Sequence, residues 1–203
     1  MTKIKNFRIP LRAREIARWL KKERGLEATP DLEVSIEQLI KEAKVWIEPA
    51  AVYSTLTRQI AEKTTTIAFP DKAIAVSVIA VSIGTSIHQK RPEAASDPVR
   101  EALLAALEQE ALSQAVQFVV RLLQDQANEE DCEMSAPVSA QENVVVSALA
   151  SLVGVQRIGV ELVPTAPEVP SCVRVAWLFW TPIGKGGSRA PACRQAGAEK
   201  AVA

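Results

Sequence analysis

The residues of this chain that could do chemistry are few and widely separated. His88 is the only histidine, and the three cysteines, Cys132, Cys172 and Cys193, form no Cys-x-x-Cys pair. A zinc site needs about four clustered ligands, so we expect three reduced thiols and no structural metal. His88 follows an apolar run and stands among polar and basic residues, which predicts an exposed loop residue and not an acid–base catalyst.

Nucleophile and phosphate motifs are equally sparse. No Gly-x-Ser-x-Gly, Walker or Gly-x-Gly-x-x-Gly pattern occurs, and the glycines and lysine of Ile183–Gly187 are not followed by a capped helix. The acidic run Glu129–Asp131 is typical of a solvated helix exit. The tryptophans lie in apolar contexts that favour packing over base stacking: Trp19, Trp46, Trp177 and Trp180. These residues therefore contain no self-evident catalytic constellation.

The charge balance limits the classes of partner that the chain is expected to bind. Lysine plus arginine and aspartate plus glutamate both number 24 in 203 residues, so the net charge is zero. This balance argues against a nucleic-acid binder that neutralises phosphates. The one locally basic stretch, Lys3–Arg24, has acidic interruptions and predicts a solvated helix face; the alternative is a surface for an acidic partner.

Membrane and secretory signals are not found. The apolar run Ala73–Ile83 is too short to span a bilayer, and Met1–Pro10 is too polar for a signal peptide. We therefore expect a cytoplasmic protein with no membrane partner.

Periodicity and capping residues predict several helices. Apolar spacing indicates a helix over Pro10–Arg24 that ends at Gly25. The pairs Thr29-Pro30 and Asp97-Pro98 each predict an N-cap followed by a proline in the first turn, and the second helix continues to about Asn128. Ser139-Ala-Gln-Glu142 matches a capping box, which predicts a helix from there to Gly154.

Strand signals occupy the remaining apolar runs. Ala51–Leu56 reads as a short strand or turn, and Ala73–Ile83 as a strand buried on both faces. Near the C-terminus, Ile158–Val163 and Val173–Phe179 predict two strands around a loop with three prolines. We expect one α+β domain over residues 1–183, with helices on a mixed or antiparallel sheet, and a disordered tail over residues 184–203.

Four segments, in order, resemble the activation (S-adenosylmethionine-binding) domain of cobalamin-dependent methionine synthase and its stand-alone relatives. Ile47–Tyr53 is similar to the family's Pro-x-Ala-Val-Tyr segment, and Ala80–Gly84 to its strand ending in Thr-Ile-Gly. Ser113–Gln117 is similar to its Ser-Ala-Ala-Val-Glu helix, and Ile158–Leu162 with Pro170 to its Ile-Gly-Val-x-Leu hairpin. Order and spacing hold from about residue 10 to residue 183. The resemblance implies S-adenosylmethionine as ligand and a corrinoid protein or cobalamin-dependent methyltransferase as partner, with cobalamin held only by that partner.

The positions that match the family's ligand residues depart from its pattern. The family's Arg-x-x-x-Gly-Tyr loop corresponds to Glu133-Met-Ser-Ala-Pro-Val138, so Glu133 stands for the arginine, Val138 for the tyrosine, and Ala136 lies between them. The family's helix glutamate corresponds to Gln117. An acidic side chain cannot supply a guanidinium fork and repels a ligand carboxylate. Two hypotheses follow: a protein that assists reductive remethylation, and a binding or assembly module whose ligand site is eroded. A third, an unrelated small enzyme, needs a nucleophile or an acid–base pair that the sequence does not indicate.

Overall fold

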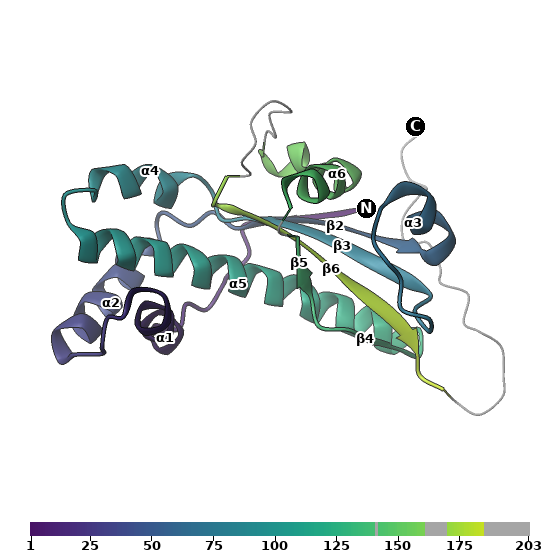
Figure 1. Cartoon of the computed structure of the whole chain (residues 1–203), viewed down its shortest axis with the longest axis horizontal. Coiled ribbons are helices and arrows are strands. Elements are labelled where there is room, and N and C mark those ends of the chain that lie inside the picture. Colours follow the sequence, from purple (N-terminus) through teal and green to yellow (C-terminus); the bar gives the residue numbers. More distant parts are fainter. Residues whose placement is uncertain (141, 161–169, 185–203) are drawn as a thin grey trace.

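An antiparallel sheet forms the centre of the molecule (Figure 1). The computed structural model describes residues 1–140, 142–160 and 170–184. Within them six strands pair in the order β1-β2-β3-β6-β4, with β5 also on β6, and every pair is antiparallel. The strands are β1 (Thr2–Lys5), β2 (Ala50–Thr57), β3 (Ala75–Ser82), β4 (Cys132–Met134), β5 (Val138–Ser139) and β6 (Val173–Pro182).

Helices cover both faces of the sheet, as Figure 1 shows. One face carries α5 (Pro98–Glu129), with α1 (Ala13–Arg24) and α2 (Pro30–Ala43) beyond it. The other face carries α3 (Arg58–Thr64) and α6 (Asn143–Val153), and α4 (Ser86–Glu93) packs beside α5 at one end of the sheet. A 3-10 turn, η1, spans Val155–Ile158. The predicted α+β class, with helices on an antiparallel sheet, is confirmed.

Local signals place the main helices as the sequence predicts. Gly25 ends α1 in the left-handed region, at φ 67°. The Thr29 hydroxyl accepts a hydrogen bond from the Leu32 N–H, and the Asp97 carboxylate accepts from the N–H groups of Val99 and Arg100, at 3.1 and 3.0 Å. Each cap satisfies backbone donors that a helix start leaves without partners.

The core lies on both sides of β3. All eight residues of β3 are buried, as expected for a strand with helices over both faces. The α5 face supplies leucines and alanines, and α6 covers the opposite side with Val146, Leu149 and Val153. The tryptophans pack as predicted, because Trp180 is 2% exposed and the other three contact the core cluster.

The basic N-terminal stretch is a solvated, ion-paired face. Its cations meet carboxylates on α1, in the following loop and on α5: Arg18–Glu15, Lys21–Glu27, Lys22–Glu23, Arg24–Glu101 and Arg12–Glu110. These pairs leave little uniform positive surface along this face.

The capping-box prediction is wrong. Ser139 lies in β5 opposite Ala176 of β6, and α6 begins only at Asn143, with no side-chain cap at Glu142. Sheet pairing holds the backbone of Ser139 extended, so its hydroxyl does not cap the helix. The apolar side of α6 against the sheet is nevertheless as expected.

Other differences lie in short elements. His88 is exposed as predicted but sits in α4, a helix that the sequence did not indicate. Ile158 ends the 3-10 turn and Gly159 adopts φ 77°, so no strand begins at Ile158. The rest of that predicted strand, over 161–163, and all but Gly184 of the predicted tail lie outside the described residues. The second strand is present as β6.

Candidate functional site

Two of the positions suggested by the family resemblance lie together at the edge of the sheet. Glu133, in β4, pairs with Thr181, and Val138, in β5, pairs with Trp177. Thr181 and Trp177 are four residues apart on β6, so both positions project to the same face of the sheet. Glu133 is exposed and Val138 is 45% exposed. This edge of the sheet therefore presents an acid and an apolar side chain to solvent.

Ser135 holds the loop between these two positions on β6. Its N–H donates to the Phe179 carbonyl at 2.9 Å, and the Phe179 N–H donates to its hydroxyl at 3.0 Å. Ala136, the third of the candidate positions, follows and is exposed. The two bonds fix the backbone of the loop, so its chemistry depends on the side chains that it presents.

Gln117 belongs to a different layer. It is an exposed residue of α5, next to Phe118. The α5 helix covers one face of the sheet, whereas Glu133 and Val138 project to the face where Phe179 packs on Ala61 of α3. Neither of the two clefts described below contains any of the four positions. Ligand binding at these positions stays a prediction from the resemblance.

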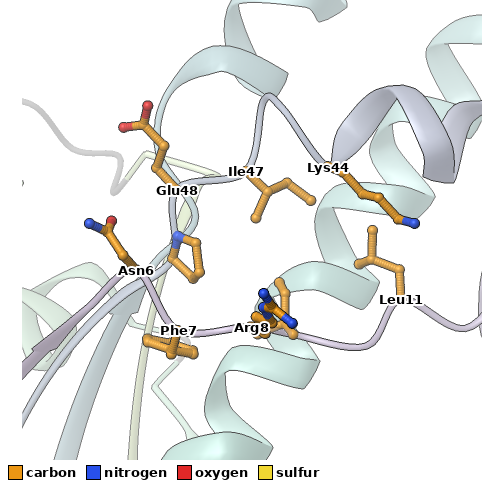
Figure 2. Close-up of a pocket in the computed structure, with 9 residues that line it drawn as sticks. Asn6, Phe7, Arg8, Leu11, Lys44, Ile47 and Glu48 are labelled. Carbon is orange, nitrogen blue, oxygen red and sulfur yellow. The ribbon is translucent and has the colours of Figure 1, made fainter.

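A larger cleft lies between two connecting segments (Figure 2). It has a volume of about 510 Å³, and its walls are the segments before α1 and after α2: Asn6, Phe7, Arg8, Ile9, Leu11, Lys44, Ile47, Glu48 and Pro49. The Asn6 N–H donates to the Pro49 carbonyl at 2.9 Å, which ties the two walls together. Asn6 has φ 55°, a left-handed conformation that asparagine tolerates.

The charges of this cleft favour an anion. Arg8 and Lys44 line it, and neither has a carboxylate within ion-pair distance in the described residues. In Figure 2, Leu11 lies beside Lys44, and Ile47 lies between Lys44 and Glu48. The Glu48 carboxylate is directed away from both cations. Two free cations over an apolar floor suit a small carboxylate or phosphate better than a sulfonium cation. No local sequence pattern indicates this cleft, because its walls are about 40 residues apart in the chain.

A second group of reactive residues surrounds the buried carboxylate of Glu108. Glu108 is 1% exposed and accepts a hydrogen bond from the Ser171 hydroxyl at 2.8 Å. Arg91 contacts its other oxygen at 3.3 Å, and Nδ1 of His88 lies 3.0 Å from the Ser171 hydroxyl. Residues from α4, α5 and the turn before β6 thus converge, although the histidine and the serine are 83 positions apart.

This group is not arranged for nucleophilic catalysis. In a catalytic triad the serine donates its proton to the imidazole, whereas here the Ser171 hydroxyl donates to a carboxylate. The neighbouring thiol is no better suited, because burial, and then the Glu108 charge, raise the pKa of Cys172. The group fastens the turn before β6 to α4 and α5.

The described part of the chain contains no cluster of three or more histidines, cysteines or acids that could hold a metal ion. No helix there is long and apolar enough to cross a bilayer. Cys132 and Cys172 are buried free thiols, while Cys193 lies outside the described residues, as does most of the Ile183–Gly187 motif.

Comparison with known proteins identifies the fold. No protein-family model matches the chain, and no curated protein matches its sequence. Among solved structures, the chain is similar to the crystal structure of the MetH reactivation domain bound to AdoHcy, with a TM-score of 0.52 and 12% sequence identity. The match covers 92% of this chain and 80% of that one. The likeness shows a shared fold across most of the chain.

Proposed function

We propose that this chain is a protein of the reactivation-domain type, which serves a cobalamin-dependent methyltransferase or another corrinoid protein. The observation that carries the proposal is the structural match over 92% of the chain, together with the four collinear sequence segments. In this role the partner holds the cobalamin, and this chain docks on the corrinoid module. Methyl transfer from S-adenosylmethionine to the reduced corrinoid then takes place between the two proteins.

Two positions that the resemblance assigns to S-adenosylmethionine binding carry unfavourable side chains in this chain. The structural neighbour holds AdoHcy, and the resemblance assigns ligand contacts to an arginine and a tyrosine of the sheet-edge loop. Glu133 and Val138 occupy those positions, both near solvent on one face of β6. Replacing a guanidinium by a carboxylate removes a charge-assisted hydrogen bond and adds repulsion of the ligand carboxylate. We expect S-adenosylmethionine to bind weakly here.

A second candidate function is a module that binds or assembles a corrinoid protein without presenting S-adenosylmethionine. The exposed Glu133 favours it, because this acid stands where the resemblance requires a cation. In this case the fold serves as a docking platform, and methyl transfer depends on another protein.

Calorimetric titration with S-adenosylmethionine and S-adenosylhomocysteine tests the ligand directly. The unmodified chain should bind at least about tenfold more weakly than the variant Glu133→Arg/Pro137→Gly/Val138→Tyr, since a charged hydrogen bond is worth about 1.5–3 kcal/mol. The control is Glu37→Arg, which makes the same glutamate-to-arginine change as Glu133→Arg at an exposed position of α2. Micromolar binding by the unmodified chain would refute the erosion of the site.

A reconstitution experiment tests the biological role. The chain is mixed with a cobalamin-dependent methionine synthase that lacks its own reactivation domain, in the cob(II)alamin state, with a reductant and S-adenosylmethionine. Recovery of the methylcobalamin spectrum supports reactivation. Co-elution with the corrinoid module without recovery supports the assembly module, and the absence of both rejects the two proposals together.

A further inference from the structure

We propose that the cleft between α1, α5 and the start of β6 binds a small organic carboxylate through the guanidinium of Arg174. The proposal is independent of reactivation and concerns different residues from the sheet-edge loop. It also shares no residue with the cleft of Figure 2.

Arg174 lies on β6 between two buried residues, Val173 and Val175. Its cross-strand partner, Val81, is fully buried, and Arg174 itself is half-buried. The guanidinium donates a hydrogen bond to the side-chain carbonyl of Gln109 on α5. Burial lowers the pKa of the Arg174 guanidinium, because the charged form loses solvation.

This charge is not compensated by a carboxylate within the part of the chain that the structure describes. In the described residues Arg174 has no ion-pair partner, and its one hydrogen-bonding side-chain partner is a neutral amide. A half-buried cation without a counter-ion is costly, and proteins ordinarily pair such a group. The half-buried, unpaired Arg174 on β6 therefore indicates that a ligand supplies the missing negative charge.

The two acids of the cleft are already engaged. Glu15 pairs with Arg18 at 2.9 Å. Glu110 is buried and accepts from Arg12 at 3.0 Å and from the Gln114 amide at 2.8 Å. Neither carboxylate lies within ion-pair distance of Arg174, so the charge stays uncompensated.

The shape and the remaining walls define the ligand class. The cleft has a volume of about 270 Å³. Its lining also includes an indole, a hydroxyl and two cations: Trp19, Ser113, Arg18 and Lys22. This volume is slightly below the usual range for drug-sized ligands, about 300–1,000 Å³. A guanidinium fork matches a carboxylate in bidentate geometry, and the indole offers an apolar surface beside it. A small aromatic monocarboxylate fits these features.

Binding is tested on the full chain with benzoate as the probe, by calorimetry and by chemical-shift changes of the backbone amides. Benzamide has nearly the same shape as benzoate but no charge, so it tests the need for the carboxylate. Inorganic phosphate is an anion without an aromatic ring, so it tests the need for the apolar part. We expect benzoate to bind at least about tenfold more tightly than either, with shift changes at the amides of Gln109, Ser113 and Arg174. Equal binding of benzamide or of phosphate would overturn the proposal, as would no binding of benzoate.

Three variants locate the site. Arg174→Gln should reduce benzoate affinity at least about tenfold, and Ser113→Leu should do the same by filling the cleft while leaving the arginine in place. Arg121→Gln removes an exposed arginine of α5 outside the cleft and should leave the affinity unchanged. If Arg174→Gln does not fold, Ser113→Leu still decides. Unchanged affinity in a folded Arg174→Gln or Ser113→Leu variant rejects the site.

Discussion

The indole N–H of Trp180 donates a hydrogen bond of 2.8 Å to the hydroxyl of Ser77, and both residues are buried in the centre of the sheet. The same hydroxyl lies 2.7 Å from the hydroxyl of Thr55 on the other neighbouring strand. One serine therefore links β2, β3 and β6 through side chains. The link allows a polar residue within a mostly apolar, fully buried strand, because every polar atom involved has a partner.

Replacing Ser77 with alanine should lower the free energy of unfolding by about 1–3 kcal/mol, because it leaves the buried indole N–H without an acceptor. Ser54→Ala removes a half-buried hydroxyl from β2 that has no hydrogen-bond partner in the described residues, and it should change the value by less than about 0.5 kcal/mol. Urea denaturation followed by tryptophan fluorescence measures both. Equal effects of the two variants would show that the Trp180 bond contributes nothing.

The elements predicted correctly from sequence are those that local chemistry specifies. The starts of α2 and α5 follow from a capping residue and a proline, and β3 follows from a run rich in valine and isoleucine. The short strands β1, β4 and β5 depend on pairing with segments that are far away in the chain, so no local signal marks them. Ser139 shows the conflict plainly, because its capping motif is overridden by pairing with β6.

Helix capping gives a prediction that separates true from apparent caps. Asp97→Ala should lower the free energy of unfolding by about 1 kcal/mol, because two N–H groups at the start of α5 lose their acceptor. Ser139→Ala should cost less than about 0.5 kcal/mol, since Ser139 lies in a strand and is exposed. The measurement is the urea midpoint at constant m-value. A loss of about 1 kcal/mol in Ser139→Ala would restore the capping box.

The candidate sites were less predictable than the fold. Arg174 and Gln109 are 65 positions apart, and the walls of the cleft in Figure 2 come from segments before α1 and after α2. Neither arrangement follows from spacing within one element. The resemblance did indicate the sheet-edge loop, but it could not indicate that Glu133 and Val138 share one face of the sheet, because that follows from the register on β6.

Arg91 is expected to matter more for stability than an ordinary surface arginine. It contacts both Glu101 and the buried Glu108, whereas Arg100 is 3.9 Å from Glu42 at the surface. Arg91→Leu should lower the free energy of unfolding by about 2–3 kcal/mol, because a buried carboxylate loses a charged partner. Arg100→Leu should stay within about 0.5 kcal/mol. Thermal and urea unfolding at two salt concentrations check this, and similar losses would reject the role of Glu108.

The buried thiols should make stability fall at alkaline pH. Burial, and then nearby carboxylates, raise the pKa of Cys132 and of Cys172 above their unfolded values. The folded state then holds these protons longer, so their contribution is complete below about pH 8.5 and is lost as the pH rises through the raised pKa values. The free energy of unfolding should therefore fall more steeply between pH 8 and 10 in the unmodified chain than in Cys132→Ala/Cys172→Ala. Parallel pH profiles would contradict this.

The stacked pair Phe7 and Phe118 should couple the segment before α1 to α5. Their ring centroids are 4.2 Å apart and the planes differ by 8°, and Phe7 also lines the cleft of Figure 2. A double-mutant cycle with Phe7→Leu and Phe118→Leu should give a coupling energy of about 0.5–1.5 kcal/mol, because each single change removes the aromatic contact while keeping an apolar side chain. The same cycle with Phe7→Leu and Phe69→Leu is the control. Phe69 packs on Phe179 instead, so its coupling to Phe7 should be within about 0.3–0.5 kcal/mol of zero. A coupling of that small size for Phe7 and Phe118 as well would mean that the segment is held by its backbone bond to Pro49 and not by the stack.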